Sequence, residues 1–266
     1  MQNSWLELEG KNVIVTGGAS GIGKQIVDEL VSVGANTVIA DLNVKTGVEV
    51  DGAYCIQCDV TKKSSVDDLI AKTAEKFGSV DGIVNNAGVN LPRLLVDYED
   101  KHNEYEMSDK DFDFMVAVNQ KGLVLCAQAA VRQMLKQNKG VIVNVASECG
   151  QEGSIGQSLY AATKGANMAL TRSWAKELGP HNIRVVAIAP GIIEKTALRT
   201  NAYNDALAYT RGTTADKLST DYSKSIPLGR EGKLSEIANL VVFLLSDRAS
   251  YITGTCINIS GGKSRG

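Results

Sequence analysis

Two residues four positions apart, Tyr160 and Lys164, have the types and the spacing to carry a proton transfer. At this separation their side chains lie on one face of a helix. Tyrosine has an ordinary pKa of about 10 and is a poor base at neutral pH. Because a neighbouring ammonium stabilises the phenolate, we expect Lys164 to lower the pKa of Tyr160, which would then act as a general base.

A serine is placed to assist this pair. Ser147 lies 13 residues before Tyr160 and follows an apolar run at 141–145, so its hydroxyl can donate a hydrogen bond to a reacting oxygen. A Tyr-x-x-x-Lys pair is common on helical surfaces and indicates little by itself. Its meaning depends on the elements and motifs around it.

The order of the elements indicates how these residues meet. Short β-branched runs alternate with stretches of helical period, which predicts βαβ units and a parallel sheet with helices on both faces. Right-handed crossovers then give a single-domain, doubly wound Rossmann-type α/β fold over residues 1–266, with about seven strands. The strands are expected at 13–15, 37–40, 54–58, 83–84, 141–143, 185–188 and 257–259, and the helices at 22–33, 66–77, 112–137, 158–178 and from about Leu234. Ligands of such folds bind beyond the carboxyl ends of the strands.

Two segments interrupt the alternation. Residues 89–110 include a charged run at 97–104, which we expect to be a solvated surface excursion. Residues 192–227 form a long connection after the carboxyl end of a strand, and connections of this length often act as lids. We therefore predict that 192–227 covers the substrate.

A glycine-rich turn at 16–23 joins the first predicted strand to the first predicted helix. Glycines permit a tight turn and let backbone N–H groups approach a pyrophosphate, which the helix N-terminus also attracts. The spacing differs from the usual G-x-G-x-x-G, so the prediction rests on the strand–turn–helix context. The cofactor contacts expected from this turn are Gly17, Ser20, Gly21, Ile22 and Gly23.

An acidic residue ends the second predicted strand. Asp41 lies 18 residues after Gly23, where a carboxylate can accept hydrogen bonds from both hydroxyls of an adenosine ribose and would repel a 2′-phosphate. No arginine follows it, because the next residues are Leu42, Asn43 and Val44. The sequence therefore favours NAD over NADP, although Asp41 can also serve as a turn former.

Composition excludes several other classes of protein. Charged residues make up 22% of the 266 residues and the formal net charge is -2, which gives no reason to expect a nucleic-acid partner. The N-terminus has neither a basic start nor a long apolar run, so we expect no signal peptide and no membrane anchor. Five scattered cysteines and two isolated histidines favour a cytoplasmic protein with reduced thiols and no metal site.

Taken together, the motifs resemble the short-chain dehydrogenase/reductase family over essentially the whole chain. The resemblance is carried by the 16–23 turn, Asp41, Asp59 with Val60, the run 85–88, Asn119, Ser147, Tyr160 with Lys164, and Pro190 with Gly191. It implies a relay in which Asn119 holds a water linked to Lys164, while Tyr160 acts as base, Ser147 orients the substrate oxygen and Lys164 binds the nicotinamide ribose. It also implies a cofactor site that includes Asp59, Val60, Asn86, Ala87, Gly88, Pro190, Gly191 and Ile193, and a homotetramer built on the helices at 112–137 and 158–178.

One stretch departs from the family pattern. The family commonly has Pro-Gly-x-x-x-Thr, whereas residues 190–196 carry one extra residue before Thr196. We therefore expect Thr196 to be a less secure pyrophosphate contact and Lys195 to enter the site.

Several loops resemble the branch of this family that acts on sorbitol 6-phosphate, namely 90–97, 148–154, 191–196 and the tail 260–266. The resemblance implies hydride transfer between C2 of D-sorbitol 6-phosphate and NAD. A sugar phosphate needs polar groups for its hydroxyls and cations for its dianion. The candidate substrate residues are Arg93, Glu148, Glu152, Gln157, Lys195 and Arg199, with Arg93 and Lys195 the first choices for the phosphate, while Arg211 or the tail from Lys263 could lend charge instead.

Alternatives remain open from the sequence. The chain could be another NAD-dependent polyol or sugar dehydrogenase, or a 3-oxoacyl-thioester reductase, which usually uses NADP and a basic docking patch. Asp41 and the acidic run at 97–106 argue against that reductase. A non-enzymatic NAD sensor would be expected to lose a residue of the Asn119, Ser147, Tyr160 and Lys164 set, and all four are present.

Overall fold

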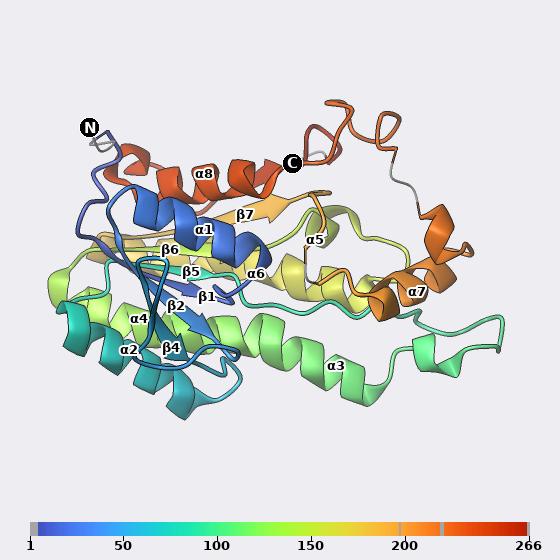
Figure 1. Cartoon of the computed structure of the whole chain (residues 1–266), viewed down its shortest axis with the longest axis horizontal. Coiled ribbons are helices and arrows are strands. Elements are labelled where there is room, and N and C mark those ends of the chain that lie inside the picture. Colours follow the sequence, from blue (N-terminus) through green and yellow to red (C-terminus); the bar gives the residue numbers. More distant parts are fainter. Residues whose placement is uncertain (1–4, 197, 219–220, 265–266) are drawn as a thin grey trace.

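A sheet of eight strands forms the centre of the molecule, in the order β3-β4-β2-β1-β5-β6-β7-β8 (Figure 1). The computed structural model describes residues 5–196, 198–218 and 221–264. The strands are β1 (Asn12–Thr16), β2 (Asn36–Asp41), β3 (Glu49–Val50), β4 (Ala53–Gln57), β5 (Gly82–Asn85), β6 (Gly140–Val145), β7 (Ile183–Pro190) and β8 (Cys256–Ile259). All pairings are parallel except that of β3 with β4. The doubly wound α/β prediction is thus confirmed, with seven parallel strands and one short addition.

The added strand belongs to a tight hairpin that the sequence reading missed. β3 and β4 are joined by Asp51 and Gly52, which have φ angles of 50° and 82°. Positive φ at both central residues defines a turn whose twist suits a two-residue hairpin, and Asp-Gly is a favoured sequence for it. The signal was therefore present, although a two-residue exposed strand has no apolar periodicity to reveal it.

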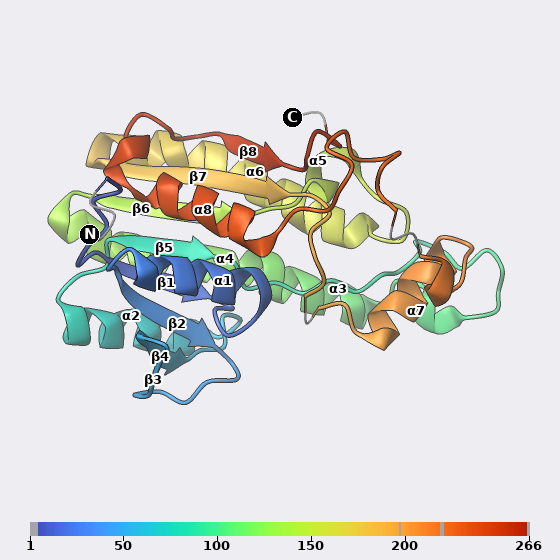
Figure 2. The same ribbon diagram turned by 45° about the horizontal axis from the view of Figure 1, so that its top comes forward.

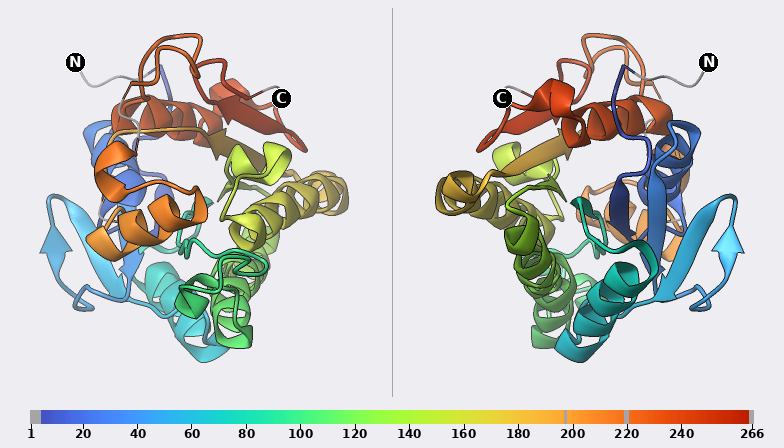
Figure 3. Two further views of the ribbon diagram at one scale, coloured as in Figure 1. Left: turned by 90° about the vertical axis from the view of Figure 1, so that its right-hand side faces the viewer. Right: turned by 90° about the vertical axis from the view of Figure 1, so that its left-hand side faces the viewer.

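Helices cover both faces of the sheet, as expected (Figure 3). They are α1 (Gly21–Ser32), α2 (Lys63–Phe77), α3 (Asp109–Val116), α4 (Leu123–Gln137), α5 (Cys149–Glu152), α6 (Ser158–Leu178), α7 (Asn201–Thr210) and α8 (Leu234–Leu245). One apolar core lies between the sheet and the pair α1 and α8, and a second lies under α2, α4 and α6. Buried aliphatic side chains on the two faces hold the strand ends in fixed register.

One long helical run, Asp109–Gln137, is apolar enough by length and composition to cross a membrane. Nearly half of its most apolar window, 44%, is buried inside the protein, and α4 packs against β5, β6 and α2. The run is therefore a core helix. Its middle, Ala117–Gly122, is π-helical, a feature that often marks functional sites.

The two interrupting segments pack on each other beyond the sheet (Figure 2). The 192–227 connection contains α7, whose Tyr209 hydroxyl donates to Asp97 Oδ1 over 2.7 Å. Asp97 is only 5% exposed and also accepts hydrogen bonds from the backbone N–H groups of Lys101 and His102. The prediction that 97–104 is merely a solvated excursion is wrong at Asp97, whose carboxylate joins this segment to α7.

Candidate active site

Tyr160 and Lys164 lie one turn apart near the start of α6, at the carboxyl end of the sheet. The Lys164 ammonium donates to the carbonyl of Val145, the last residue of β6, over 2.7 Å. The same nitrogen lies 5.7 Å from the centre of the Tyr160 ring. Ser147 follows β6 and is 8% exposed, and its hydroxyl accepts a hydrogen bond from the backbone N–H of Cys149. The structure therefore brings these three residues together.

Burial dominates the titration of the pair. It lowers the pKa of Lys164 from 10.5 to about 8, because the ammonium loses its hydration. Burial also raises the pKa of Tyr160 well above its usual range, and the opposing hydrogen bond with Ser147 is the smaller effect. The net direction for Tyr160 is opposite to the one expected from Lys164 alone. In the chain by itself the phenol is therefore neutral at neutral pH.

Asn119 lies in the π-helical segment behind this pair and is 1% exposed. Its Oδ1 accepts from the backbone N–H of Val89, and its Nδ2 donates to the carbonyl of Val89 and to Thr163 Oγ1. Gly88 separates Asn119 from the lysine. A Cβ atom at Gly88 would lie 3.3 Å from Asn119 Oδ1 and 3.5 Å from Lys164 Nζ, so this glycine lets both polar groups approach one loop.

The glycine-rich turn is packed too closely for larger residues at two positions. A Cβ atom at Gly23 would lie 2.1 Å from the carbonyl oxygen of Gly17 and 2.6 Å from Asn86 Nδ2. Gly17 itself has φ +63°, a left-handed conformation that favours glycine. Asn86 Nδ2 donates to the carbonyls of Thr16 and Gly17, so the turn is tied to the end of β5.

A cleft of about 570 Å³ runs along these strand ends. All of the predicted cofactor residues line it except Gly23, which is buried behind Gly17. These residues are Gly17, Ser20, Gly21, Ile22, Asp41, Asp59, Val60, Asn86, Ala87, Gly88, Tyr160, Lys164, Pro190, Gly191 and Ile193. The cleft joins a glycine cradle, two carboxylates and a buried tyrosine–lysine pair, which suits a nicotinamide dinucleotide.

The two carboxylates differ in how they are engaged. Asp41 accepts hydrogen bonds from the backbone N–H groups of Ala19 and Asn43 while it lines the cleft. Asp59 accepts from the hydroxyl and the backbone N–H of Thr61, and its pKa is lowered chiefly by that hydroxyl and further by the nearby Lys62 ammonium. Asp41 thus ties the glycine-rich turn to the end of β2, and Asp59 orders the turn that follows it.

Of the two first choices for binding phosphate, neither lines the cleft. Arg93 makes a two-pronged pair with Asp111, through Nε–Oδ2 at 3.0 Å and Nη2–Oδ1 at 3.3 Å. Asp111 in turn forms a capping box with Ser108 at the start of α3. The Arg93 guanidinium therefore holds the 89–110 segment to that helix.

The extra residue in the 190–196 stretch is accommodated without Lys195 entering the site. Lys195 is exposed and lies outside the cleft lining, whereas Thr196 lines the cleft. A Cβ atom at Gly21 would lie 3.4 Å from Thr196 Cβ, so Thr196 sits against the glycine-rich turn. The expectation that Lys195 enters the site is therefore wrong, and Thr196 keeps a place beside the glycine-rich turn.

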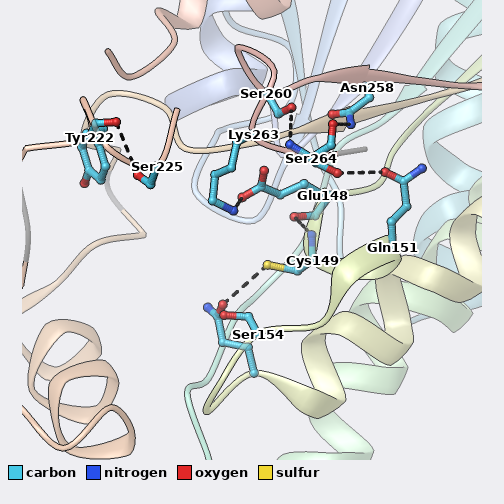
Figure 4. Close-up of polar contacts among 12 residues, drawn as sticks. Glu148, Cys149, Gln151, Ser154, Tyr222, Ser225, Asn258, Ser260, Lys263 and Ser264 are labelled. Carbon is cyan, nitrogen blue, oxygen red and sulfur yellow. Dashed lines mark hydrogen bonds and ion pairs between the residues drawn. The ribbon is translucent and has the colours of Figure 1, made fainter. Parts of the chain in front are cut away.

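Glu148 faces the C-terminal tail (Figure 4). It is 5% exposed, and its Oε1 pairs with the Lys263 ammonium over 2.6 Å. Its Oε2 is buried with no hydrogen-bond partner among the described residues. The tail is also held by Ser264, which donates to Gln151 Oε1. Arg265 and Gly266, also considered as sources of charge, lie outside the described residues.

Arg199 and Gln157 are two further predicted substrate residues. Arg199 lines the cleft. Gln157 is 6% exposed, immediately precedes α6 and donates to the hydroxyl of Tyr203 over 3.0 Å. Glu152 is exposed on α5 and lies outside the lining, and Arg211 donates to Ser154 at the surface.

Among the cleft residues that were not predicted as site residues, Tyr203 and Asn90 have polar side chains that contact each other. Tyr203 lies on α7, and Asn90 lies in the loop after β5, and both line the cleft. Asn90 begins the 90–97 stretch but was given no role there, and α7 falls within the 192–227 connection, for which no helix was predicted. A tyrosine one turn from an arginine in the predicted substrate-covering segment was the only available signal.

Comparison with known proteins places the chain in a family. Residues 17–264 match the family model described as enoyl-(acyl carrier protein) reductase. The chain is 52% identical to the sorbitol-6-phosphate 2-dehydrogenase of Klebsiella pneumoniae, covering 99% of this chain and 100% of that protein. It is 37% identical to a 3-oxoacyl-(acyl-carrier-protein) reductase of Thermotoga maritima, covering 97% and 99% of the two chains.

Solved structures agree with this placement. A 3-ketoacyl-(acyl-carrier-protein) reductase from Brucella melitensis, complexed with NADH, superimposes with a TM-score of 0.81 at 31% identity, covering 97% of this chain and 100% of that chain. The aldohexose dehydrogenase of Thermoplasma acidophilum also gives 0.81, at 29% identity and coverages of 97% and 95%. The chain therefore belongs to the short-chain dehydrogenase/reductase family. It is a nicotinamide-dependent oxidoreductase.

Proposed function

We propose that the protein transfers a hydride between C2 of D-sorbitol 6-phosphate and NAD, giving D-fructose 6-phosphate. The observation that carries the proposal is that the Arg199 side chain lines the cleft. Arg199 and Lys164 are the only arginine or lysine side chains among the described residues that line the cleft. The Lys164 ammonium already donates a hydrogen bond to the carbonyl of Val145. A guanidinium in the lining of the cleft supplies the cation that a phosphate dianion needs. The 52% identity to the Klebsiella dehydrogenase supports the same substrate.

In this proposal the chain's own residues handle the proton. With NAD bound, the positive charge of its nicotinamide together with the Lys164 ammonium would favour the phenolate of Tyr160, which then takes the proton of the substrate hydroxyl. The Ser147 hydroxyl donates a hydrogen bond that orients the same oxygen. Lys164, with its pKa lowered to about 8, can exchange a proton with Tyr160 near neutral pH, and Asn119, bonded to the Val89 backbone, would hold the water that carries the proton onward from Lys164. Bound along the cleft, NAD supplies the chemistry of hydride acceptance.

The preference for NAD over NADP rests on Asp41. Its carboxylate lines the cleft at the end of β2, where a 2′-phosphate would bring like charges together. Leu42, which follows it, is 59% exposed and offers no compensating charge. We therefore assign adenosine-ribose recognition to Asp41.

The relatives favour one second candidate, reduction of 3-oxoacyl thioesters. It is supported by the 37% identity to the Thermotoga reductase and by the Brucella structure. The two candidates make opposite demands on the substrate side of the cleft, because a thioester chain needs no phosphate at Arg199 and offers few hydroxyls.

A substrate panel separates them. NADH formation is measured with sorbitol 6-phosphate, sorbitol, mannitol 1-phosphate and xylitol against NAD and NADP, and acetoacetyl-CoA reduction is measured in parallel. We expect kcat/KM for sorbitol 6-phosphate to exceed that for sorbitol by at least about 100-fold, because a charge-assisted phosphate contact is worth about 3 kcal/mol. Equal values for the two polyols would reject the phosphate assignment, and turnover of the thioester alone would favour the second candidate.

We also propose a cytoplasmic homotetramer. Phe112 on α3 is 48% exposed and lies outside the cleft lining, which suits a subunit contact on this helix. Sedimentation velocity on the full chain tests the assembly, with a monomer at micromolar concentration as the contrary result.

A further inference from the structure

Tyr203 is the residue of α7 that reaches into the cleft. Its hydroxyl oxygen accepts two hydrogen bonds, from Gln157 Nε2 over 3.0 Å and from Asn90 Nδ2 over 3.4 Å. Both partners are amide donors, so they occupy the lone pairs of the phenol and leave its hydrogen available. Within 5–196, 198–218 and 221–264, no acceptor receives that hydrogen.

The two amides also hold the Tyr203 hydroxyl close to the segments of Tyr160 and Asn119. Gln157 lies three residues before Tyr160, at the start of the same helix. Asn90 follows Val89, whose backbone is bonded twice to the Asn119 side chain. Tyr203 is thus held by the two segments that carry the base and the relay residue. Burial keeps it neutral by raising its pKa, so it remains a donor at neutral pH.

We propose that Tyr203 is a specificity-determining residue, which donates its phenolic hydrogen to a hydroxyl on a carbon next to the reacting carbon of the substrate. This inference rests on the proposed polyol phosphate activity. It adds which substrate hydroxyl the site recognises by a hydrogen bond. A carbon without a hydroxyl at that position would leave the donor without an acceptor in the cleft, which is how a site built around a hydrogen bond rejects an analogue that lacks it.

The same helix offers a matched control. Tyr209 lies six residues further along α7, but its hydroxyl donates to Asp97, and it is absent from the cleft lining. Tyr203→Phe and Tyr209→Phe each remove one hydroxyl from α7 and keep the ring. Only the first variant removes a donor that faces the cleft.

The experiment compares the two variants with wild type on three substrates: sorbitol 6-phosphate, its 1-deoxy analogue and its 3-deoxy analogue. Y203F should lower kcat/KM for the full substrate by about 10- to 100-fold, mainly through KM. For one deoxy analogue the loss should shrink to less than about 3-fold, because the donor has no partner to lose. Y209F, which loosens α7 without touching the cleft, should change all three substrates by one common factor. NADH affinity, measured by fluorescence titration, should stay the same in Y203F.

The outcomes separate this inference from the proposed function. If wild type does not turn over sorbitol 6-phosphate, the proposed function fails. If wild type is active but Y203F loses the same factor on all three substrates, or loses nothing, the role of Tyr203 is overturned while the proposed function stands.

Discussion

Lys164 is bound through its ammonium to the carbonyl of Val145, 2.7 Å away, so helix α6 is tied to the end of β6 by a buried charge. The charge has a cost, because burial lowers the pKa of Lys164 to about 8 while the unfolded chain keeps a value near 10.5. Between these values the unfolded state binds more protons than the folded state. Stability therefore rises as pH increases from about 8 to about 10.5.

Lys164→Met should reveal this cost. At pH 7 we expect the variant to be inactive and yet more stable to unfolding by about 2 kcal/mol, since it removes a buried charge and loses one hydrogen bond. The gain should shrink as pH rises past 8. Urea unfolding at pH 7 and pH 10 measures it, and a variant that is less stable at both values would contradict the burial argument.

Changing Asp41 should weaken the discrimination between cofactors. In Asp41→Ala the like-charge repulsion of a 2′-phosphate disappears, together with the ribose hydrogen bonds, so the kcat/KM ratio of NAD to NADP should fall by about 10-fold or more. Asn43→Ala is the neighbouring control, because its side chain does not line the cleft. An unchanged ratio in the Asp41 variant would place cofactor choice elsewhere.

Gly23→Ala should damage the cofactor cradle through a steric clash. The new methyl group would lie 2.1 Å from the Gly17 carbonyl oxygen, so the turn must shift. We expect a loss of about 1–3 kcal/mol in stability and at least about 10-fold weaker NADH binding. Gly179→Ala has open space around its Cβ position and an ordinary φ, and should change neither quantity. Thermal unfolding and fluorescence titration give both readouts.

Glu148 and Lys263 should couple in a double-mutant cycle. Lys263→Met leaves the buried carboxylate of Glu148, next to Ser147, without its partner. We expect the free energy of unfolding to fall by about 1–3 kcal/mol. This is less than the cost for a fully buried pair, because Lys263 is 27% exposed. Adding Glu148→Gln removes the unpaired charge. It should therefore restore part of the stability, and part of the kcat, that Lys263→Met loses. Additive losses in the double variant would show that the pair does not act as a unit.

Arg199 and Arg93 give opposite predictions although both were candidates for binding phosphate. Arg199→Met should raise KM for sorbitol 6-phosphate by about 100-fold and leave stability nearly unchanged. Arg93→Met leaves Asp111 unpaired and should lower the melting temperature with a much smaller effect on KM. The reverse result would return the phosphate to Arg93.

A structural feature can be predicted from the sequence when the interactions that determine it are local along the chain. The helix predicted at 158–178 coincides with α6, because local apolar periodicity determines it. The π-helical segment around Asn119 was not predicted, since one extra residue per turn leaves no mark on a short apolar pattern. The partner of Arg93 lies 18 residues away, and only the folded chain shows that Asp111 claims the guanidinium.

The titration of Tyr160 escaped prediction for a related reason. The spacing to Lys164 indicates a neighbouring positive charge, but the degree of burial of both groups is a property of the assembled cleft. Desolvation acts on both partners and outweighs their proximity. The positions of reactive groups can thus be read from the sequence, whereas their protonation states depend on packing.

The bond between Tyr209 and Asp97 has a consequence for how such enzymes can be re-engineered. It joins the 89–110 segment to α7, so two parts that border the cleft are linked into one unit beyond the strand ends. Transfer of either part alone would leave the Asp97 carboxylate or the Tyr209 hydroxyl without its hydrogen-bond partner. Transplanting both together should move substrate preference onto a related scaffold while the hydride-transfer machinery of the recipient stays intact.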